Sequence, residues 1–89
     1  MSFRTFSVGR ASDADIQING QSVSRKHLEL TRTDDGKYYL IDANSTAGTR
    51  IRKGESWELM KQGFVNESDT LLLGKEEVQV RQLVHSIKH

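Results

Sequence analysis

The sequence of 89 residues contains neither cysteine nor proline, and only 7% of its residues are aromatic. Without cysteine, the chain can form no disulfide framework and no thiolate metal site. No stretch approaches the ~20 apolar residues that span a bilayer, and no signal-peptide pattern opens the chain. Because proline is absent, turns must use Gly, Asn, Asp and Ser. We therefore expect a cytoplasmic domain, whole or part of a larger protein, that does not insert into a membrane.

Charge is nearly balanced, with 13 basic and 12 acidic residues and a net charge of +1. Such a balance is not typical of a general binder of nucleic acids or membranes. The three histidines, His27, His85 and His89, are too scattered to indicate a metal site, and we expect no metal and no cofactor. The length favours one domain over residues 1–89 with a modest core.

Short segments that alternate apolar and polar residues predict β-strands. Leu28 and Leu30 share one face in "KHLELTRT", and the "DDG" turn that follows predicts a hairpin into "KYYLID". Further strands are expected in "FRTFSV", "DADIQING", "TRIR", "SWELM" and "TLLLG". In "EVQVRQLV", the alternation of Val78 and Val80 favours a final strand over a helix. The pattern predicts an all-β sandwich or barrel.

Two segments place polar groups where a strand ends or begins. Gly9 lets the chain bend after a strand, and Arg10 follows it. In "SVSRKHLEL", Ser24 and His27 lie three residues apart, which is compatible with a nucleophile and its base. No Gly-x-Ser-x-Gly elbow surrounds Ser24, so we expect no catalytic residue. We expect instead that His27 packs beneath the loop and hydrogen-bonds it, which fixes Ser24 and Arg25.

A third polar segment, "DANSTAGTRI" at residues 42–51, combines the hydroxyls of Ser45 and Thr46 with Gly48, which permits positive φ or close approach. Six cations lie in or beside the three segments: Arg10, Arg25, Lys26, Arg50, Arg52 and Lys53. Cations among hydroxyls and loop N–H groups suit an oxyanion such as phosphate. An ordinary polar turn is the alternative, and the P-loop sequence is absent.

Gly9-Arg10, "SRKH" at residues 24–27 and "DANSTAGT" at residues 42–49 together resemble a forkhead-associated (FHA) domain in order and spacing. "DTLLLG" at residues 69–74 is similar to the turn and penultimate strand of this family, so the resemblance covers about residues 6–84. It implies an FHA-like β-sandwich of two antiparallel sheets and eleven strands, whose end loops bind phosphothreonine in extended peptides. Recognition of phosphorylated motifs by arginine is a known binding mode in signalling. The partner would be a protein phosphorylated by a Ser/Thr kinase.

The resemblance also assigns roles to single residues. Four would contact the phosphate or the peptide: Arg10, Ser24, Arg25 and Thr46. Three would shape the loops: Gly9, His27 and Gly48. A phosphate carries a charge of about −1.5 to −2 and three strong acceptor oxygens, so Arg10 would pair with it and Ser24 would donate its hydroxyl.

Two departures from the family pattern matter. Ala47 stands in the peptide site, where the family usually has an Asn whose side chain holds the peptide backbone. Losing such a hydrogen bond costs about 1–3 kcal/mol, or about ten- to a hundredfold in affinity. Family members also usually have another strand before residues 3–8, so it stays open whether that strand is missing here and leaves an edge exposed. The alternative function is a phospho-independent interaction or oligomerisation domain, which includes a homo-oligomer.

Overall fold

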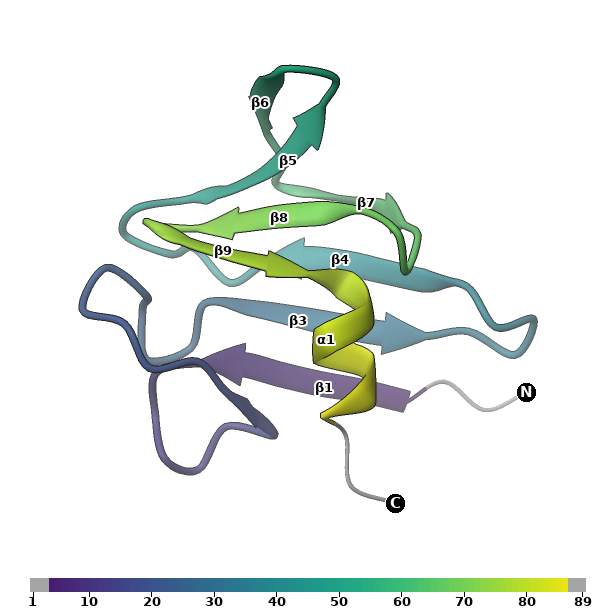
Figure 1. The fold of residues 1–89 in the computed structure, drawn as a ribbon. Coiled ribbons are helices and arrows are strands. Elements are labelled where there is room, and N and C mark those ends of the chain that lie inside the picture. Colours follow the sequence, from purple (N-terminus) through teal and green to yellow (C-terminus); the bar gives the residue numbers. More distant parts are fainter. Residues whose placement is uncertain (1–3, 87–89) are drawn as a thin grey trace.

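Residues 4–86 of a computed structural model form a sandwich of two β-sheets with one short helix (Figure 1). Its elements in chain order are β1 (Arg4–Gly9), β2 (Ile16–Gln17), β3 (Leu28–Arg32), β4 (Tyr38–Asp42), β5 (Thr49–Lys53), β6 (Ser56–Leu59), β7 (Gln62–Val65), β8 (Thr70–Leu73), β9 (Glu76–Gln79) and α1 (Val80–His85). One sheet has the order β2-β1-β3-β4-β7, and the other has the order β6-β5-β8-β9. The predicted all-β sandwich is confirmed, with nine strands in the described residues rather than the eleven that the resemblance implied.

Alternation along β3 and β4 decides which face of the first sheet is buried. Leu28 and Leu30 are fully buried, and Leu40 pairs with Leu30 on the same inner face. The predicted hairpin between these strands is present: the Thr33 N–H donates to Lys37 O at 2.8 Å. Because side chains alternate with a period of two, Glu29 and Thr31 of β3 and Tyr39 and Ile41 of β4 face outward.

The core lies between the two sheets and draws on most of the elements. Its buried apolar residues are Phe6, Val8, Ile16, Val23, Leu28, Leu30, Tyr38, Leu40, Ile51, Val65, Leu71, Leu73, Val80 and Leu83. Two polar residues, His27 and Thr49, are also fully buried. Both lie at the same end of the sandwich, where a buried polar group needs a hydrogen-bond partner.

The first sheet is mixed, which differs from the two antiparallel sheets that the resemblance implied. β2 pairs with β1 in parallel, with Val8 opposite Ile16. The reason lies in the connection between them: the Ser7 N–H donates to Asp15 Oδ2 at 2.8 Å, and the Asp15 N–H donates to Ser7 Oγ at 3.0 Å. These bonds hold Asp15 beside β1 and allow Ile16 to enter the core.

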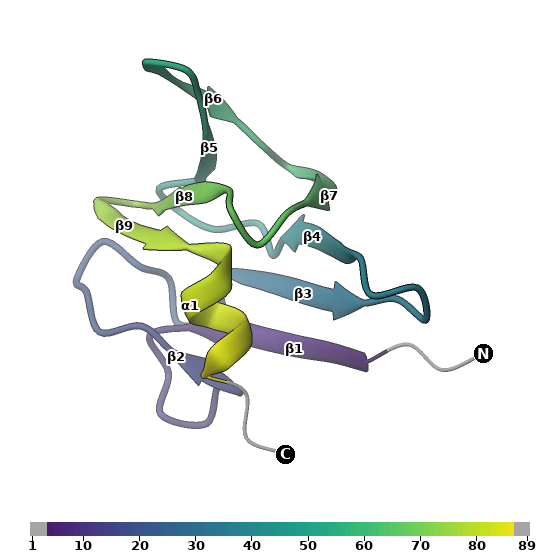
Figure 2. The same cartoon turned by 45° about the vertical axis from the view of Figure 1, so that its right-hand side comes forward.

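The end of the chain also differs from the prediction, because the strand over residues 76–84 stops at Gln79 and α1 follows. Val80 and Leu83 are buried at helical spacing, and α1 lies across β1 and β3 in both views (Figures 1 and 2). The Gln79 N–H donates to Gln82 Oε1 at 3.0 Å, which satisfies a backbone donor at the helix start. Within residues 4–86, no helix has the length and apolar character needed to cross a bilayer.

Candidate functional site

Three loops meet at one end of the sandwich because of the strand register. Val8 pairs with Leu28, and Leu28 pairs with Asp42, so the end of β1, the start of β3 and the end of β4 lie side by side. We call residues 10–15 the first loop, residues 18–27 the second loop and residues 43–48 the third loop. In Figure 1 they lie at the left end, opposite the β3–β4 hairpin. The topology therefore gathers the three polar segments that the sequence singled out.

Gly9 allows the first and second loops to touch through their backbones. A Cβ atom at Gly9 would lie 2.1 Å from Arg25 O and 2.9 Å from Ser24 O, far inside contact distance. In its absence, the Arg10 N–H donates to Ser24 O at 3.0 Å and the Ala11 N–H donates to Arg25 O at 3.1 Å. Glycine is needed here for close approach, because no side chain fits.

Arg10 is exposed, but its guanidinium is oriented by the second loop. Arg10 Nε donates to Val23 O at 3.0 Å, which uses one of the five N–H donors of the group. In the part of the chain that the structure describes, Arg10 forms no ion pair, and its side chain donates to no acceptor other than Val23 O. The Nη1 and Nη2 donors therefore form a fixed fork that can bind a planar or tetrahedral oxyanion.

His27 is fully buried and connects the second loop to the third. The Ser24 N–H donates to His27 Nδ1 at 3.1 Å, and His27 Nε2 lies 3.0 Å from Gly48 O. Because a backbone N–H can only donate and a carbonyl can only accept, the two contacts fit the tautomer that carries its proton on Nε2. The burial and the hydrogen bonds that we expected of His27 are present.

This geometry contradicts the nucleophile–base interpretation of Ser24 and His27. Both ring nitrogens of His27 are engaged by backbone groups, so neither remains for Ser24 Oγ. The Ser24 hydroxyl instead accepts a hydrogen bond from the Thr46 N–H at 3.0 Å. Its own proton stays free to donate, which agrees with the role that the resemblance gave Ser24. Thr46 is exposed and contributes its backbone N–H to this contact between loops.

Asp42 holds the third loop in shape, a role that the sequence analysis missed. Its carboxylate accepts hydrogen bonds from the Ser45 N–H at 2.9 Å, from Ser45 Oγ at 2.6 Å and from Thr49 Oγ1 at 2.7 Å. Ser45 Oγ in turn accepts from the Gly48 N–H at 3.1 Å, and Gly48 has a φ of 85°. An Asp followed three residues later by Ser is a signal for such a turn. It could have been read from the sequence.

These hydrogen bonds set the pKa of Asp42. Burial raises it, but the hydrogen bonds from Ser45 and Thr49 favour the ionised form more strongly, and the net pKa lies below the ordinary value for aspartate. A carboxyl group with a lowered pKa stabilises the fold above its unfolded-state pKa of about 3.9, and this contribution is lost as the pH falls through the folded-state pKa.

We expect Asp42→Asn to lower the free energy of unfolding by about 2 kcal/mol at pH 7, because charge-assisted hydrogen bonds become weaker neutral ones. The difference from the native chain should begin to shrink as the pH falls below the unfolded-state pKa of about 3.9, and it should be lost as the pH falls through the lower pKa of the folded state. Urea unfolding at several pH values measures it. The exposed Asp13→Asn is the matched control and should change little. A difference that stayed constant down to acidic pH would contradict this account of Asp42.

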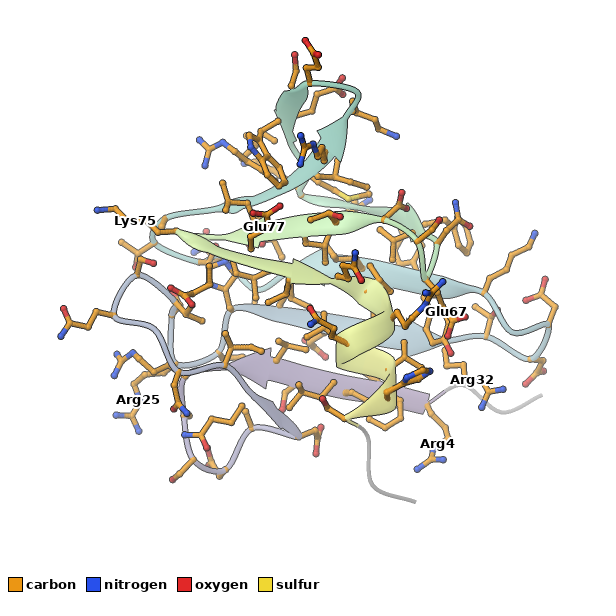
Figure 3. The ribbon with its side chains drawn as sticks, viewed as in Figure 1. Arg4, Arg25, Arg32, Glu67, Lys75 and Glu77 are labelled. Carbon is orange, nitrogen blue, oxygen red and sulfur yellow. The ribbon has the colours of Figure 1, made fainter. Side chains whose placement is uncertain are left out.

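The structure brings only part of the predicted cation cluster to the loops. Arg25 and Lys26 lie in the second loop, and Figure 3 shows Arg25 pointing outward at the loop end, opposite Arg32. Arg50 lies beside the third loop, where Nη1 donates to Ala47 O at 3.4 Å. Two predicted members, Arg52 and Lys53, are at the far end of β5, because the strand runs away from the loop. Arg52 there pairs with Glu77 at 3.7 Å.

Ala47 is exposed in the third loop and brings no polar side chain to it. A shallow hollow beside the second loop is lined by Ser7, Ala11, Asp13, Ala14, Arg25 and Lys26. No group of three or more His, Cys, Asp or Glu residues that could hold a metal ion is found within residues 4–86. Within residues 4–86, the site is therefore a surface of N–H and O–H donors with the guanidinium groups of Arg10 and Arg25 outside any ion pair, which suits an anion.

Comparison with known proteins places this arrangement in a family. The family model described as "FHA domain" matches residues 6–74. The FHA domain-containing protein FhaA of Mycobacterium tuberculosis is 36% identical over 76 residues, which is 83% of this chain and 13% of that protein. The glycogen accumulation regulator GarA of Mycolicibacterium smegmatis is 31% identical over 71 residues, or 80% of this chain and 42% of GarA. The chain thus spans less than half the length of these curated relatives.

Solved structures give the same result. The FHA domain of FhaA, solved with the intracellular domain of a second protein, superposes with a TM-score of 0.70 and 30% identity over 86% of this chain and 79% of that chain. An FHA domain solved in work on phosphothreonine-dependent interactions gives a TM-score of 0.74 and 29% identity over 89% and 77% of the two chains. The FHA family consists of protein-interaction modules rather than enzymes. Sequence and fold agree, and the chain belongs to the FHA domain family.

Proposed function

We propose that this chain is a phosphothreonine-dependent interaction domain that binds phosphorylated proteins through its first, second and third loops. The target would be a protein phosphorylated by a Ser/Thr kinase. A cytoplasmic location and a single FHA domain over residues 1–89 belong to the same proposal and stay predictions. The relatives support the class of partner, since one similar FHA domain was studied for phosphothreonine-dependent interactions.

The observation that carries the proposal is the fixed, unpaired guanidinium of Arg10. Its Nε is held by Val23 O at 3.0 Å, the residue is exposed, and its Nη donors have no hydrogen-bond partner within residues 4–86. Ser24, whose carbonyl accepts from the Arg10 N–H, offers a hydroxyl proton in the same place. A phosphate would receive charge-assisted bonds from Arg10 and a further bond from Ser24. Arg25 adds a second cation at the rim, and no carboxylate in the described residues neutralises either arginine at 4 Å or less.

A second candidate function rests on Ala47. Ala47 has no side-chain donor or acceptor for a peptide backbone. If the chain binds a phosphopeptide, the phosphate would therefore supply most of the affinity. The alternative is a phospho-independent interaction domain with a degenerate peptide site. The two functions differ in one observable: only the first loses its partner after phosphatase treatment.

An array of phosphothreonine peptides, with matched phosphoserine and unmodified threonine peptides, tests the proposal. We expect binding to phosphothreonine peptides only, and we expect Ala47→Asn to strengthen it about ten- to a hundredfold by adding a hydrogen bond to the peptide backbone. Calorimetry on the strongest peptides gives the ratio. If the native chain binds none of the phosphopeptides while the Ala47→Asn variant binds several, the native site is degenerate and the second candidate function holds.

A further inference from the structure

Two arginines lie opposite each other on the inner face of the first sheet, at the end of the sandwich away from the three loops. Arg4 on β1 pairs with Arg32 on β3, and Arg32 pairs with Tyr38 on β4. Because side chains alternate along a strand, Arg4 shares its face with the buried Phe6. Figure 3 shows both arginines at this end. The face of β1 and β3 that carries the core therefore ends in a pair of cations.

The charge of this pair is not neutralised within the described residues. Neither Arg4 nor Arg32 forms an ion pair there, and both residues are exposed. The Arg4 guanidinium lies over the Phe6 ring, with Cζ 5.3 Å from the ring centroid. Directly opposite residues have Cβ atoms about 4.5–5.5 Å apart, and like charges at that spacing destabilise a sheet. Because groups that lower stability are often retained for function, we expect this pair to bind a ligand.

A pocket of about 380 Å³ lies between this end of the sheet and the last turn of α1. It is lined by apolar and polar side chains: Phe6, Tyr38, Val84, Arg4, Arg32, Glu67 and His85. We call these residues the arginine pocket. Two further hollows, of about 430 Å³ and 200 Å³, share Arg32 with it. Together the three extend past the ends of β1, β3 and β4, which span about 10 Å at the usual strand spacing. An extended chain of about three residues has that length.

We infer that the arginine pocket binds an acidic segment of a partner protein. A carboxylate side chain of that segment accepts hydrogen bonds from Arg4 and Arg32, and a neighbouring apolar side chain covers Phe6 and Tyr38. Planar guanidinium groups match the two oxygens of a carboxylate. The pocket and the three loops lie at opposite ends of the sandwich, so this contact is separate from the binding of a phosphothreonine.

The lining of the pocket favours a protein segment over other anions. Free phosphate would pair with the arginines but would leave the apolar surface of Phe6, Tyr38 and Val84 uncovered. Nucleic acid carries closely spaced phosphates, which the carboxylate of Glu67 repels. A segment that combines a carboxylate with an apolar side chain matches both parts of the lining. Its source is a protein, because the FHA family consists of protein-interaction modules.

An NMR titration with the peptide acetyl-Glu-Leu-Glu-Leu-amide tests the inference, at low ionic strength where exposed charges are screened least. We expect the amide and guanidinium signals of Arg4 and Arg32 to shift, with half-saturation at about 1 mM, because two charge-assisted hydrogen bonds supply that affinity. No shift of these signals at about ten times that concentration would overturn the inference. The signals lie far from the three loops, so failure here is distinct from failure of the proposed function.

Matched probes identify the class of ligand. The peptide acetyl-Glu-Ser-Glu-Ser-amide has the same charge without the apolar groups and should bind about fivefold more weakly, since less apolar surface is buried. Acetyl-Lys-Leu-Lys-Leu-amide should not bind. If inorganic phosphate or the Glu-Ser peptide shifts the two arginines at the same concentration as the Glu-Leu peptide, the apolar lining takes no part and a protein segment is not the ligand.

Three variants locate the contact. Arg4→Gln and Arg32→Gln should each weaken binding of the Glu-Leu peptide about tenfold, since each removes a charge-assisted hydrogen bond. Lys53→Gln is the matched control and should bind the peptide as the native chain does, because Lys53 is an exposed cation at the end of β5. An equal loss of binding in all three variants would show a general attraction of charge and would contradict the site.

Urea unfolding tests the cost of the arginine pair without any ligand. Arg32→Gln should raise the midpoint of unfolding, because it relieves the repulsion from Arg4 while keeping a side chain of similar length. Lys53→Gln should leave the midpoint unchanged, as exposed substitutions usually do. A midpoint that falls in Arg32→Gln would mean that Arg32 stabilises the fold, and the argument that the pair is retained for binding would be wrong.

Discussion

Replacing Arg10 with alanine is expected to lower the affinity for a phosphothreonine peptide about a hundredfold. Two charge-assisted hydrogen bonds from the Nη donors to the phosphate are lost, and each contributes about 1.5 kcal/mol or more. Arg10→Lys should recover part of the affinity, because it keeps the charge but loses the fork that Val23 O orients at 3.0 Å. Calorimetric titration with one phosphothreonine peptide measures all three proteins.

Arg32→Ala is the matched control for Arg10→Ala, because it removes the same side chain at the other end of the sandwich. Figure 3 shows Arg32 far from the loops, beside Arg4 and Glu67. This variant should leave the affinity unchanged. Arg10→Ala should also remain folded, since it loses one hydrogen bond to Val23 O, which contributes about 1 kcal/mol. Equal affinities for Arg10→Ala and Arg32→Ala would show that Arg10 does not bind the phosphate.

Replacing His27 with alanine is expected to lower the free energy of unfolding by about 3 kcal/mol and to abolish peptide binding. The change leaves a cavity beneath the loops, and it leaves the Ser24 N–H and the Gly48 carbonyl without the partners they have at 3.1 Å and 3.0 Å. Binding is lost because the second and third loops are no longer held together at Ser24 and Thr46. Urea unfolding and peptide titration on one preparation measure both effects.

His85→Ala provides the control for the loss of an imidazole. His85 is exposed in the last turn of α1, and its replacement should change stability by no more than about 0.5 kcal/mol. A His27→Ala variant as stable as His85→Ala would mean that the two hydrogen bonds of His27 contribute nothing to the loops. A His27→Ala variant that is destabilised yet still binds the peptide would show that His27 stabilises the fold but is not needed to hold the binding loops together.

The alternation of apolar and polar residues was sufficient to predict the strands that have one face toward the core. Leu28 and Leu30, with the turn before Tyr38, identify the β3–β4 hairpin because period two and turn chemistry are properties of adjacent residues. The burial of His27 could be expected for the same local reason, since it stands where a loop meets a strand. The order of the polar segments then led to the family, whose fold places them at one end.

Features that depend on residues distant in sequence were not predictable in this way. The parallel pairing of β2 depends on Asp15 meeting Ser7 across a loop, which no local pattern encodes. The helix α1 was missed because Val78 and Val80 alternate as in a strand, whereas the helical spacing of Val80 and Leu83 begins only after Gln79. Arg52 and Lys53 were assigned to the loops because they are near in sequence, although β5 carries them away.

The central claim is that the loops at one end of the sandwich bind phosphothreonine. The most direct test is an NMR titration of the native chain with a phosphothreonine peptide and, separately, with the same peptide unphosphorylated. The account predicts that the amide signals of Arg10, Ser24, Arg25 and Thr46 shift with the phosphorylated peptide and do not move with the other. Shifts at these residues with both peptides, or with neither, would contradict it.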